Sequence, residues 1–227
     1  MRLGRLFARI QSVGFEGPFY EGVSGKLRFF FETIGWRREF VFLGTRDSFA
    51  SARPELPLEL TIVGSFDGLE MLRSQLDAEY YPGFLDTWRK PFSWGEQVAL
   101  ASVAGQLAAF AWVQHGNSEG FPTYYNRLFE NDARILRVGV LPTFRRRGLN
   151  SRMMYTLLER LLAEGFLRVF AESHKYNVPS VRTFLKVGFR AVALLTVVSI
   201  PGTGELVRWG SLRDVETHLR DLDAKSR

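Results

Sequence analysis

The sequence predicts an α/β protein built on a mixed β-sheet with helices on its faces. In the second half of the chain, short apolar runs alternate with segments whose apolar residues recur at helical spacing. Before them, two apolar runs at residues 97–103 and 106–114 are joined at Ala104-Gly105, which indicates a tight antiparallel hairpin. A hairpin followed by strands that alternate with helices gives a sheet of mixed strand directions.

The first 55 residues are predicted to form an extension to this sheet domain. Residues 1–14 carry arginines among apolar residues, which favours a short amphipathic helix docked on the domain, with a membrane-surface anchor as the alternative. Lys26–Leu43 alternate aromatic and polar side chains in two runs, and they predict an N-terminal β-hairpin. Gly44–Pro57 serve as a linker. The division is therefore residues 1–55 for the extension and residues 56–227 for the sheet domain.

The elements after the linker follow from apolar spacing and from cap and turn residues. The expected elements are a short strand at Leu60–Val63, helices after Ser65 and Pro82, the hairpin, a strand at Ala133–Val140, a helix at Leu149–Glu164, a strand at Leu167–Ala171, a helix at Pro179–Val187, strands at Ala191–Ile200 and Glu205–Trp209, and a helix at Leu212–Leu222. Gly165 is placed to end the longest helix. The segment Gly116–Asp132 is long and irregular, as functional loops often are.

Composition narrows the classes of function. The absence of cysteine excludes disulfides, thiolate metal sites and a cysteine nucleophile, and three separated histidines argue against a metal cofactor. The net charge of +6 favours an anionic partner, but the basic residues are dispersed, which argues against nucleic acid. No apolar run reaches the ~18 to 20 residues of a membrane span, and no signal peptide is recognisable. We therefore expect a cytoplasmic protein without an integral membrane segment.

Residues 138–150, Val-Gly-Val-Leu-Pro-Thr-Phe-Arg-Arg-Arg-Gly-Leu-Asn, carry the clearest chemical signal. A strand ends, a basic turn follows and a helix begins, so backbone N–H groups and the positive end of a helix dipole converge on one spot. Such a spot binds phosphate. Gly148 lets the backbone come close, and the arginines add charge-assisted hydrogen bonds. Taken alone, the turn also fits a solvated basic loop beside a helix start.

This passage resembles the acyl-CoA pyrophosphate loop of the GNAT superfamily of N-acetyltransferases. The family pattern is Arg or Gln, two residues, Gly, one residue, then Gly or Ala. Arg145 and Gly148 match it, and Asn150 replaces the final small residue. A second family signature, an Asn that opens a helix closing with Gly-Phe, is matched by Asn177 and by Gly188-Phe189. Two signatures in the expected order identify the chain as a member of this superfamily.

The resemblance covers Leu58–Trp209 and implies a GNAT-like fold, in which a mixed, splayed central β-sheet is flanked by helices. It also implies acetyl-CoA or another acyl-CoA as cofactor. The implied contacts are Val138, Gly139 and Val140 along the pantetheine arm, Arg145, Arg146, Arg147, Gly148, Leu149 and Asn150 at the pyrophosphate, and Asn177 beside the arm. A backbone N–H left free where the strands splay would face the thioester oxygen and stabilise the charge that develops there.

The family mechanism, direct attack of an amine on the thioester, requires a base on the acceptor side. Glu130 and Asp132, at the mouth of the central strand, are the first candidates as catalytic residues. Glu172 and His174, after the next strand, are the second. For each of them a solvated surface position is the alternative.

Phe184 stands seven residues after Asn177, where the family places a tyrosine that protonates the departing CoA sulfur. Phenylalanine has no proton to give, so either the protein does not catalyse transfer or the thiolate leaves without that help. A thiol pKa near ~8.5 makes the thiolate a tolerable leaving group, and Tyr155 or Tyr176 could supply a hydroxyl. We therefore predict an active enzyme.

Three functions stay open at this point. The first is an N-acyltransferase that acts on a primary amine of a small molecule, with an amino sugar or its nucleotide-linked form suggested by similarity to GNAT members found with cell-surface polysaccharide genes. The second is an N-acyl amino acid synthase with a long-chain donor, suggested by the Phe-rich N-terminal strands. The third is a non-catalytic acyl-CoA-binding module. A homodimer is compatible with all three.

Overall fold

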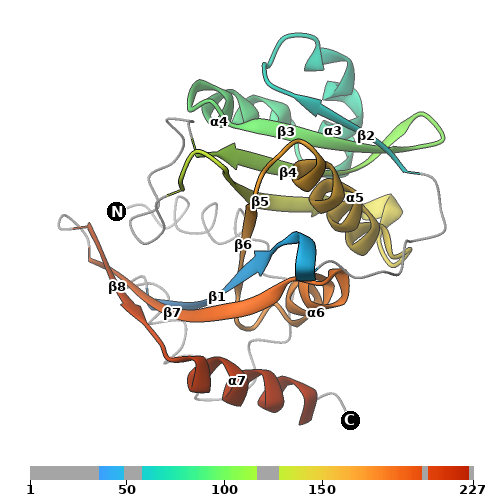
Figure 1. The fold of residues 1–227 in the computed structure, drawn as a ribbon. Helices are drawn as coiled ribbons and strands as arrows, with labels where there is room; N and C mark the ends of the chain where they lie inside the picture. Colours follow the sequence, from blue (N-terminus) through green and yellow to red (C-terminus); the bar gives the residue numbers. More distant parts are fainter. Residues whose placement is uncertain (1–35, 49–57, 117–127, 201–203, 225–227) are drawn as a thin grey trace.

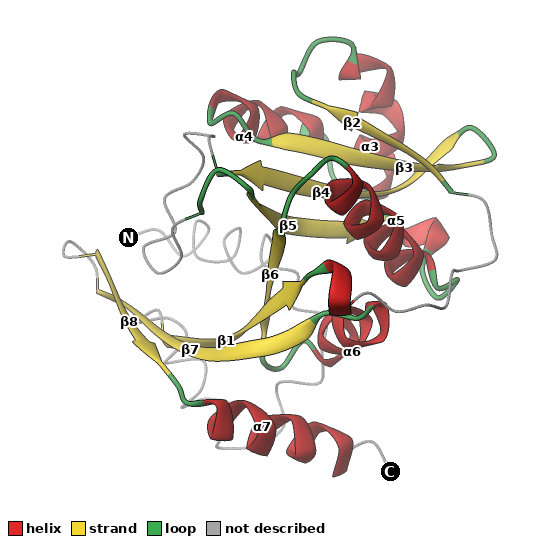
Figure 2. Cartoon of the chain, viewed as in Figure 1, coloured by secondary structure: helices red, strands yellow, loops and turns green. Residues whose placement is uncertain are grey.

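The structure is a computed structural model, and it describes residues 36–48, 58–116, 128–200 and 204–224. These residues contain one eight-stranded sheet with helices on both faces, which confirms the predicted mixed α/β fold (Figures 1 and 2). The strands are β1 (Trp36–Gly44), β2 (Glu59–Val63), β3 (Gln97–Val103), β4 (Gln106–His115), β5 (Asp132–Val140), β6 (Arg168–His174), β7 (Arg190–Ile200) and β8 (Gly204–Trp209). Their order across the sheet is β2-β3-β4-β5-β6-β1-β7-β8.

Helices cover the two faces of the sheet unequally. The α-helices are α3 (Arg73–Glu79), α4 (Arg89–Ser93), α5 (Leu149–Ala163), α6 (Val178–Val187) and α7 (Leu212–Ala224), and the short 3-10 helices are η1 (Arg46–Ser48), η2 (Leu69–Leu72), η3 (Phe84–Trp88) and η4 (Pro142–Phe144). Helices α5 and α6 bury their apolar sides on one face, together with residues of β1, β3, β4 and β5. The segment from η2 to α4 packs on the other face against Phe110 and Trp112 of β4. Among the described residues, no helix is long and apolar enough to span a membrane.

The hairpin of β3 and β4 forms where the sequence predicts it. Val103 pairs with Gln106, and the two residues between them, Ala104 and Gly105, have φ angles of 51° and 76°. Two successive positive φ angles are the requirement of a type I′ turn, whose twist matches that of the strands. The predicted end of α5 is also confirmed, because Gly165 follows the helix with a φ of 102°.

Strand β1 lies in the interior of the sheet. It pairs antiparallel with β6 on one edge and with β7 on the other. Phe40 and Phe42 of β1 are fully buried in the same core as α5 and α6. The predicted extension thus contributes a central strand; the first strand of the predicted hairpin and the predicted helix at residues 1–14 lie outside the described residues.

The sheet opens between β5 and β6. These parallel strands pair from Asp132 with Arg168 as far as Ile135 with Ala171, and beyond that point they are not paired. Immediately afterwards β5 carries a bulge, because Leu136 and Gly139 lie opposite Trp112 and Phe110 of β4. The extra residue in β5 is accompanied by a φ of 42° at Arg137, a conformation that costs a residue other than glycine ~1 to 2 kcal/mol. The predicted splay is therefore present, with a bulge at its apex.

Gly139 follows the bulge and faces the ring of Phe110. A Cβ at this position would lie 2.5 Å from Cζ of Phe110, so no larger side chain fits without moving that ring. Val138 and Val140, on either side, pack partly against the core shared with α5. The strand residues predicted to line the cofactor thus border the opening between β5 and β6.

Candidate active site

The loop between β5 and α5 has the geometry of an anion site. Arg145, Arg146 and Arg147 are exposed, and Arg146 and Gly148 adopt left-handed conformations with φ angles of 64° and 70°. No carbonyl of the described residues accepts a hydrogen bond from the N–H groups of Gly148, Leu149 and Asn150, which begin α5. Open N–H groups, a helix N-terminus and three exposed arginines therefore occur together in one loop.

Two neighbouring residues at the end of α3 hold this loop. The carboxylate of Glu79 accepts hydrogen bonds from the backbone N–H of Thr143 at 3.3 Å and from its hydroxyl. Arg145 donates through Nε to the carbonyl of Val140 at 3.3 Å, and its guanidinium hydrogen-bonds to Tyr80. Burial raises the pKa of Tyr80, and Arg145 offsets part of that shift. No sequence motif points to Glu79 or Tyr80, because both lie more than 60 residues before the loop.

Helix α6 begins directly after Asn177. The side-chain oxygen of Asn177 accepts from the N–H of Ser180 at 3.3 Å and caps the helix, while the residue itself stays exposed. Asn150, in the first turn of α5, donates to the hydroxyl of Thr183 on α6 at 3.4 Å. The structure thus connects the loop of the first family signature with the helix of the second.

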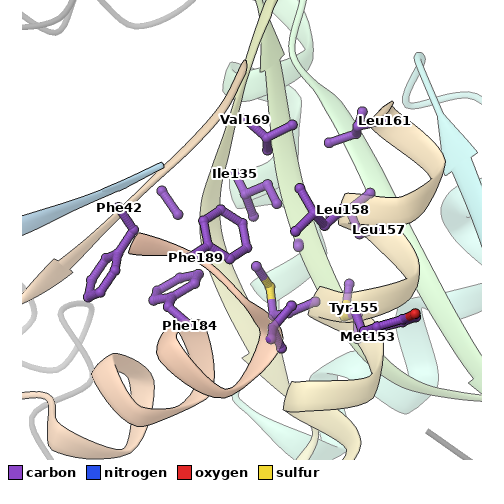
Figure 3. Close-up of a cluster of buried hydrophobic side chains, with 14 of the residues drawn as sticks. Phe42, Ile135, Met153, Tyr155, Leu157, Leu158, Leu161, Val169, Phe184 and Phe189 are labelled. Atoms are coloured by element: carbon purple, nitrogen blue, oxygen red, sulfur yellow. The ribbon is translucent and has the colours of Figure 1, made fainter. Parts of the chain in front are cut away.

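Phe184 lies in the hydrophobic core. Only 3% of its surface is exposed, and its ring stacks on Phe42 of β1 with 4.9 Å between ring centroids. Phe189 meets the same ring edge-on at 5.3 Å (Figure 3). The position where the family carries its tyrosine is therefore filled by an aromatic cluster that includes the N-terminal strand, and its contact with the cofactor stays a prediction.

The first candidates for the base lie at the far end of β5 from the loop. Asp132 is the first residue of β5, and the loop begins after the ninth, a strand length of ~25 Å at the usual rise per residue. Its carboxylate receives two hydrogen bonds from Arg168, at 2.7 and 2.8 Å, and one from the N–H of Phe129 at 2.9 Å. Glu130 is exposed in the preceding turn. The structure does not bring either residue to the opening of the sheet, and the buried, fully bonded Asp132 has the environment of a structural residue.

The second candidates lie at the apex of the splay. Glu172 directly follows Ala171, the last residue of β6 that pairs with β5. Because Ala171 faces α5, the side chain of Glu172 faces the opposite side of the sheet, where Arg134 approaches it at 3.5 Å. Its side chain is 12% exposed. His174 lies two residues further along the same face, with its ring 5.4 Å from that of Tyr176.

Sequence reasoning missed a row of buried polar side chains on this same face. The polar row consists of Glu96 before β3, Gln114 on β4 and Arg134 on β5, and it runs to Glu172 on β6. Glu96 is fully buried and forms an ion pair with Arg137 of the bulge. Only burial distinguishes these residues from ordinary charged positions, and burial follows from strand pairing that local sequence does not reveal. Among the described residues, no group of three or more His, Cys, Asp or Glu side chains could hold a metal ion.

Comparison with known proteins finds one matching family model and several similar solved structures. The model described as "Acetyltransferase (GNAT) family" matches residues 69–189, more than half of the chain. An acetyltransferase of the GNAT family from Colwellia psychrerythraea is 12% identical with a TM-score of 0.49, over 77% of this chain and 56% of that one. A GCN5-related N-acetyltransferase from Kribbella flavida is 16% identical with a TM-score of 0.47, over 78% of this chain and 64% of that one.

A further solved structure, AAC(6')-Ib in complex with ribostamycin and coenzyme A, is 14% identical with a TM-score of 0.50, over 71% of this chain and 97% of that one. The chain thus spans between about half and two thirds of the Colwellia and Kribbella chains, and nearly all of AAC(6')-Ib. No curated protein sequence is similar enough to count as a relative. Because the family model matches the segment that holds the loop, both signatures and the splayed strands, the chain belongs to the GNAT acetyltransferase family.

Proposed function

We propose that this protein is an acyl-CoA-dependent N-acyltransferase that transfers an acetyl or longer acyl group to the primary amine of a small molecule. The observation that carries the proposal is the opening between β5 and β6, with a bulge at its apex and a basic loop at its end. Family membership supports CoA as the cofactor. A cytoplasmic location and a homodimer stay predictions.

Two parts of the chain would bind CoA. The N–H groups of Gly148, Leu149 and Asn150 would donate to the pyrophosphate, and the three arginines of the loop would neutralise its charge. The backbone of β5 at Val138, Gly139 and Val140 would lie along the pantetheine arm, since it loses its β6 partner there. The side-chain nitrogen of Asn177 would contact the arm, because its oxygen already caps α6.

The reacting groups would meet at the apex of the splay. Acyl-CoA supplies a thioester: the amine nitrogen would form a bond to its carbonyl carbon, and the carbon–sulfur bond would break so that CoA leaves as the thiolate. A backbone N–H of the bulge next to Val138 would donate to the thioester oxygen, where a fixed donor stabilises developing charge by a few kcal/mol. Glu172 would take the proton of the attacking amine, directly or through one water, because it lies at the same level on the opposite strand. We therefore propose Glu172, in place of Glu130 and Asp132, as the catalytic base.

An assay of CoA release tests this function. Protein, acetyl-CoA and a broad panel of primary amines should give thiol release that depends on both the protein and one class of amine. Glu172→Gln should lower kcat by ~100- to 10,000-fold, the usual contribution of general base catalysis, and leave acetyl-CoA binding unchanged in calorimetry. Failure of the protein to bind CoA would overturn the proposal.

One observation favours a second function, a non-catalytic acyl-CoA-binding module. Phe184 occupies the position of the family's acid and is buried against Phe42. Tight CoA binding without thiol release for any amine would support this alternative. The long-chain N-acyl amino acid synthase stays an untested alternative: Phe40 and Phe42 are fully buried, and the other phenylalanines that suggested it, at residues 29–31, lie outside the described residues.

A further inference from the structure

Arg137 combines an unusual backbone with an unusual position. It is one of three described non-glycine residues with a positive φ, and it lies in the bulge of β5 where that strand leaves β6. Strained conformations of this kind persist only where the surrounding structure holds them, and they gather at functional sites. The strained residue thus lies in the strand segment that borders the opening between β5 and β6.

The side chain of Arg137 lies on the face of the sheet opposite α5 and α6. Its guanidinium forms an ion pair with Glu96 and lies 5.3 Å from the ring centre of Trp112, which packs on that face against η3 and α4. Glu172 faces the same side, because its neighbour Ala171 faces α5. The guanidinium lies over β4 and reaches Glu96 beside β3, whereas Glu172 lies on β6, so the two side chains share one face of the sheet on either side of β5.

Arg137 pairs with Glu96 but is not fully enclosed by the protein. Glu96 is fully buried, whereas 41% of the Arg137 side chain is exposed. Partial burial lowers the pKa of Arg137 to about 10, which leaves it charged at neutral pH. A guanidinium has five N–H donors in a fixed fork, and a single carboxylate engages at most part of them. Glu96 and Trp112 thus contact the guanidinium, while part of the Arg137 side chain stays open to solvent.

We propose that Arg137 binds an anionic group, a carboxylate or a phosphate, on the acceptor amine. The inference rests on the proposed function and narrows its acceptor to amines with an acidic substituent, such as amino acids or phosphorylated amino sugars. Arg137 would fix the acceptor through paired hydrogen bonds, and Glu172 would receive the proton of its amine. The fork geometry of arginine suits both carboxylate and phosphate.

The competing explanation is that Arg137 only neutralises Glu96. A double variant separates the two explanations, because Arg137→Gly with Glu96→Gln removes both charges. Glycine also accepts the left-handed backbone without strain, so the bulge is retained. Glu96→Gln alone is the matched control, since it removes the buried charge and keeps the guanidinium. Thermal unfolding of each variant checks that the fold is intact.

The measurement compares acceptors that differ only in the anionic group. One pair is an amino acid and its amide, and the other is glucosamine 6-phosphate and glucosamine. The wild-type protein and Glu96→Gln should prefer the anionic member of at least one pair. The double variant should raise KM for that member by ~10- to 100-fold, with KM for acetyl-CoA and for the neutral member within ~2-fold, and Arg137→Lys should recover part of the loss.

The outcomes distinguish this inference from the function on which it rests. Equal preference in the double variant and the wild type, or a wild type that favours the neutral member of both pairs, would overturn the role of Arg137 and leave the acyltransferase intact. If no amine in the panel gives thiol release, the proposed acyltransferase function itself is overturned. The amino acid pair identifies a carboxylate as the recognised group, and the glucosamine pair identifies a phosphate.

Discussion

At the residue scale, the phosphate loop depends on the backbone conformation of Gly148. Its φ is 70°, and a Cβ added there would meet no atom within 4 Å. The cost of a side chain is therefore conformational, ~1 to 2 kcal/mol, rather than steric. Gly148→Val should lower CoA affinity at least tenfold in calorimetry, because strain rotates the N–H groups away from the phosphate. Gly148→Asn is the control, since asparagine tolerates this conformation and should lose less CoA affinity. If the wild type and Gly148→Val bind CoA equally well, the phosphate binds elsewhere.

Arg145 tests the same site through charge. The residue is exposed and already oriented by the Val140 carbonyl and Tyr80. Arg145→Ala should weaken CoA binding by ~1.5 to 3 kcal/mol, the range for hydrogen bonds to charged groups. The wild-type affinity should also fall as salt is added. Arg213→Ala on α7, an exposed arginine distant in sequence, should leave the dissociation constant unchanged.

Asp132 is expected to act in stability rather than in catalysis. Asp132→Asn removes the charge that pairs with Arg168 and should cost ~1 to 3 kcal/mol of the free energy of unfolding, measured with denaturant. Turnover of the remaining folded protein should match the wild type. A fall in kcat as large as that of Glu172→Gln would show instead that Asp132 takes part in catalysis.

At the scale of elements, α6 and β1 are joined through Phe184. A hydroxyl introduced by Phe184→Tyr would enter an apolar cluster, where a polar group without a partner costs ~1 to 3 kcal/mol. We expect a lower melting temperature and no gain in kcat for thiol release. A higher kcat would show instead that the new hydroxyl reaches the departing sulfur, and that this acid was missing.

Turns and helix ends, which depend on neighbouring residues, were predicted correctly. The bulge and the polar row, which depend on contacts between distant segments, were not predicted. Ala104-Gly105 predicts the hairpin because a two-residue turn needs local φ angles, and Gly165 marks the end of α5 for the same reason. The bulge at Arg137 has no such mark, since arginine has no preference for positive φ. The loop after β5 and the start of α5 were therefore predictable, whereas their contact with CoA stays a prediction. The polar row and the hydrogen bonds between Glu79 and Thr143 could not be predicted, because they join segments that meet only in the folded chain.

At the scale of the whole molecule, β1 joins the two parts of the sheet. Phe42 is fully buried against α6 and lies in a strand with partners on both edges. Phe42→Ala should therefore cost ~3 to 5 kcal/mol of stability in denaturant unfolding, as large aromatic truncations in cores do. Met71→Ala, at a side chain 80% exposed, is the control and should change stability by less than ~0.5 kcal/mol. A similar small change for both would mean that β1 is dispensable.

The interior position of β1 also sets the order in which a nascent chain can fold on the ribosome. Phe40, Val41 and Phe42 are translated first, and their partners in β6 and β7 follow only after roughly 130 and 150 further residues. During that interval a strand that ends fully buried has neither of its neighbours, and an unpaired apolar strand invites aggregation. Cells that synthesise this protein are therefore expected to shield β1 until β7 has left the exit tunnel, because the sheet can close around β1 only when both of its partner strands are available.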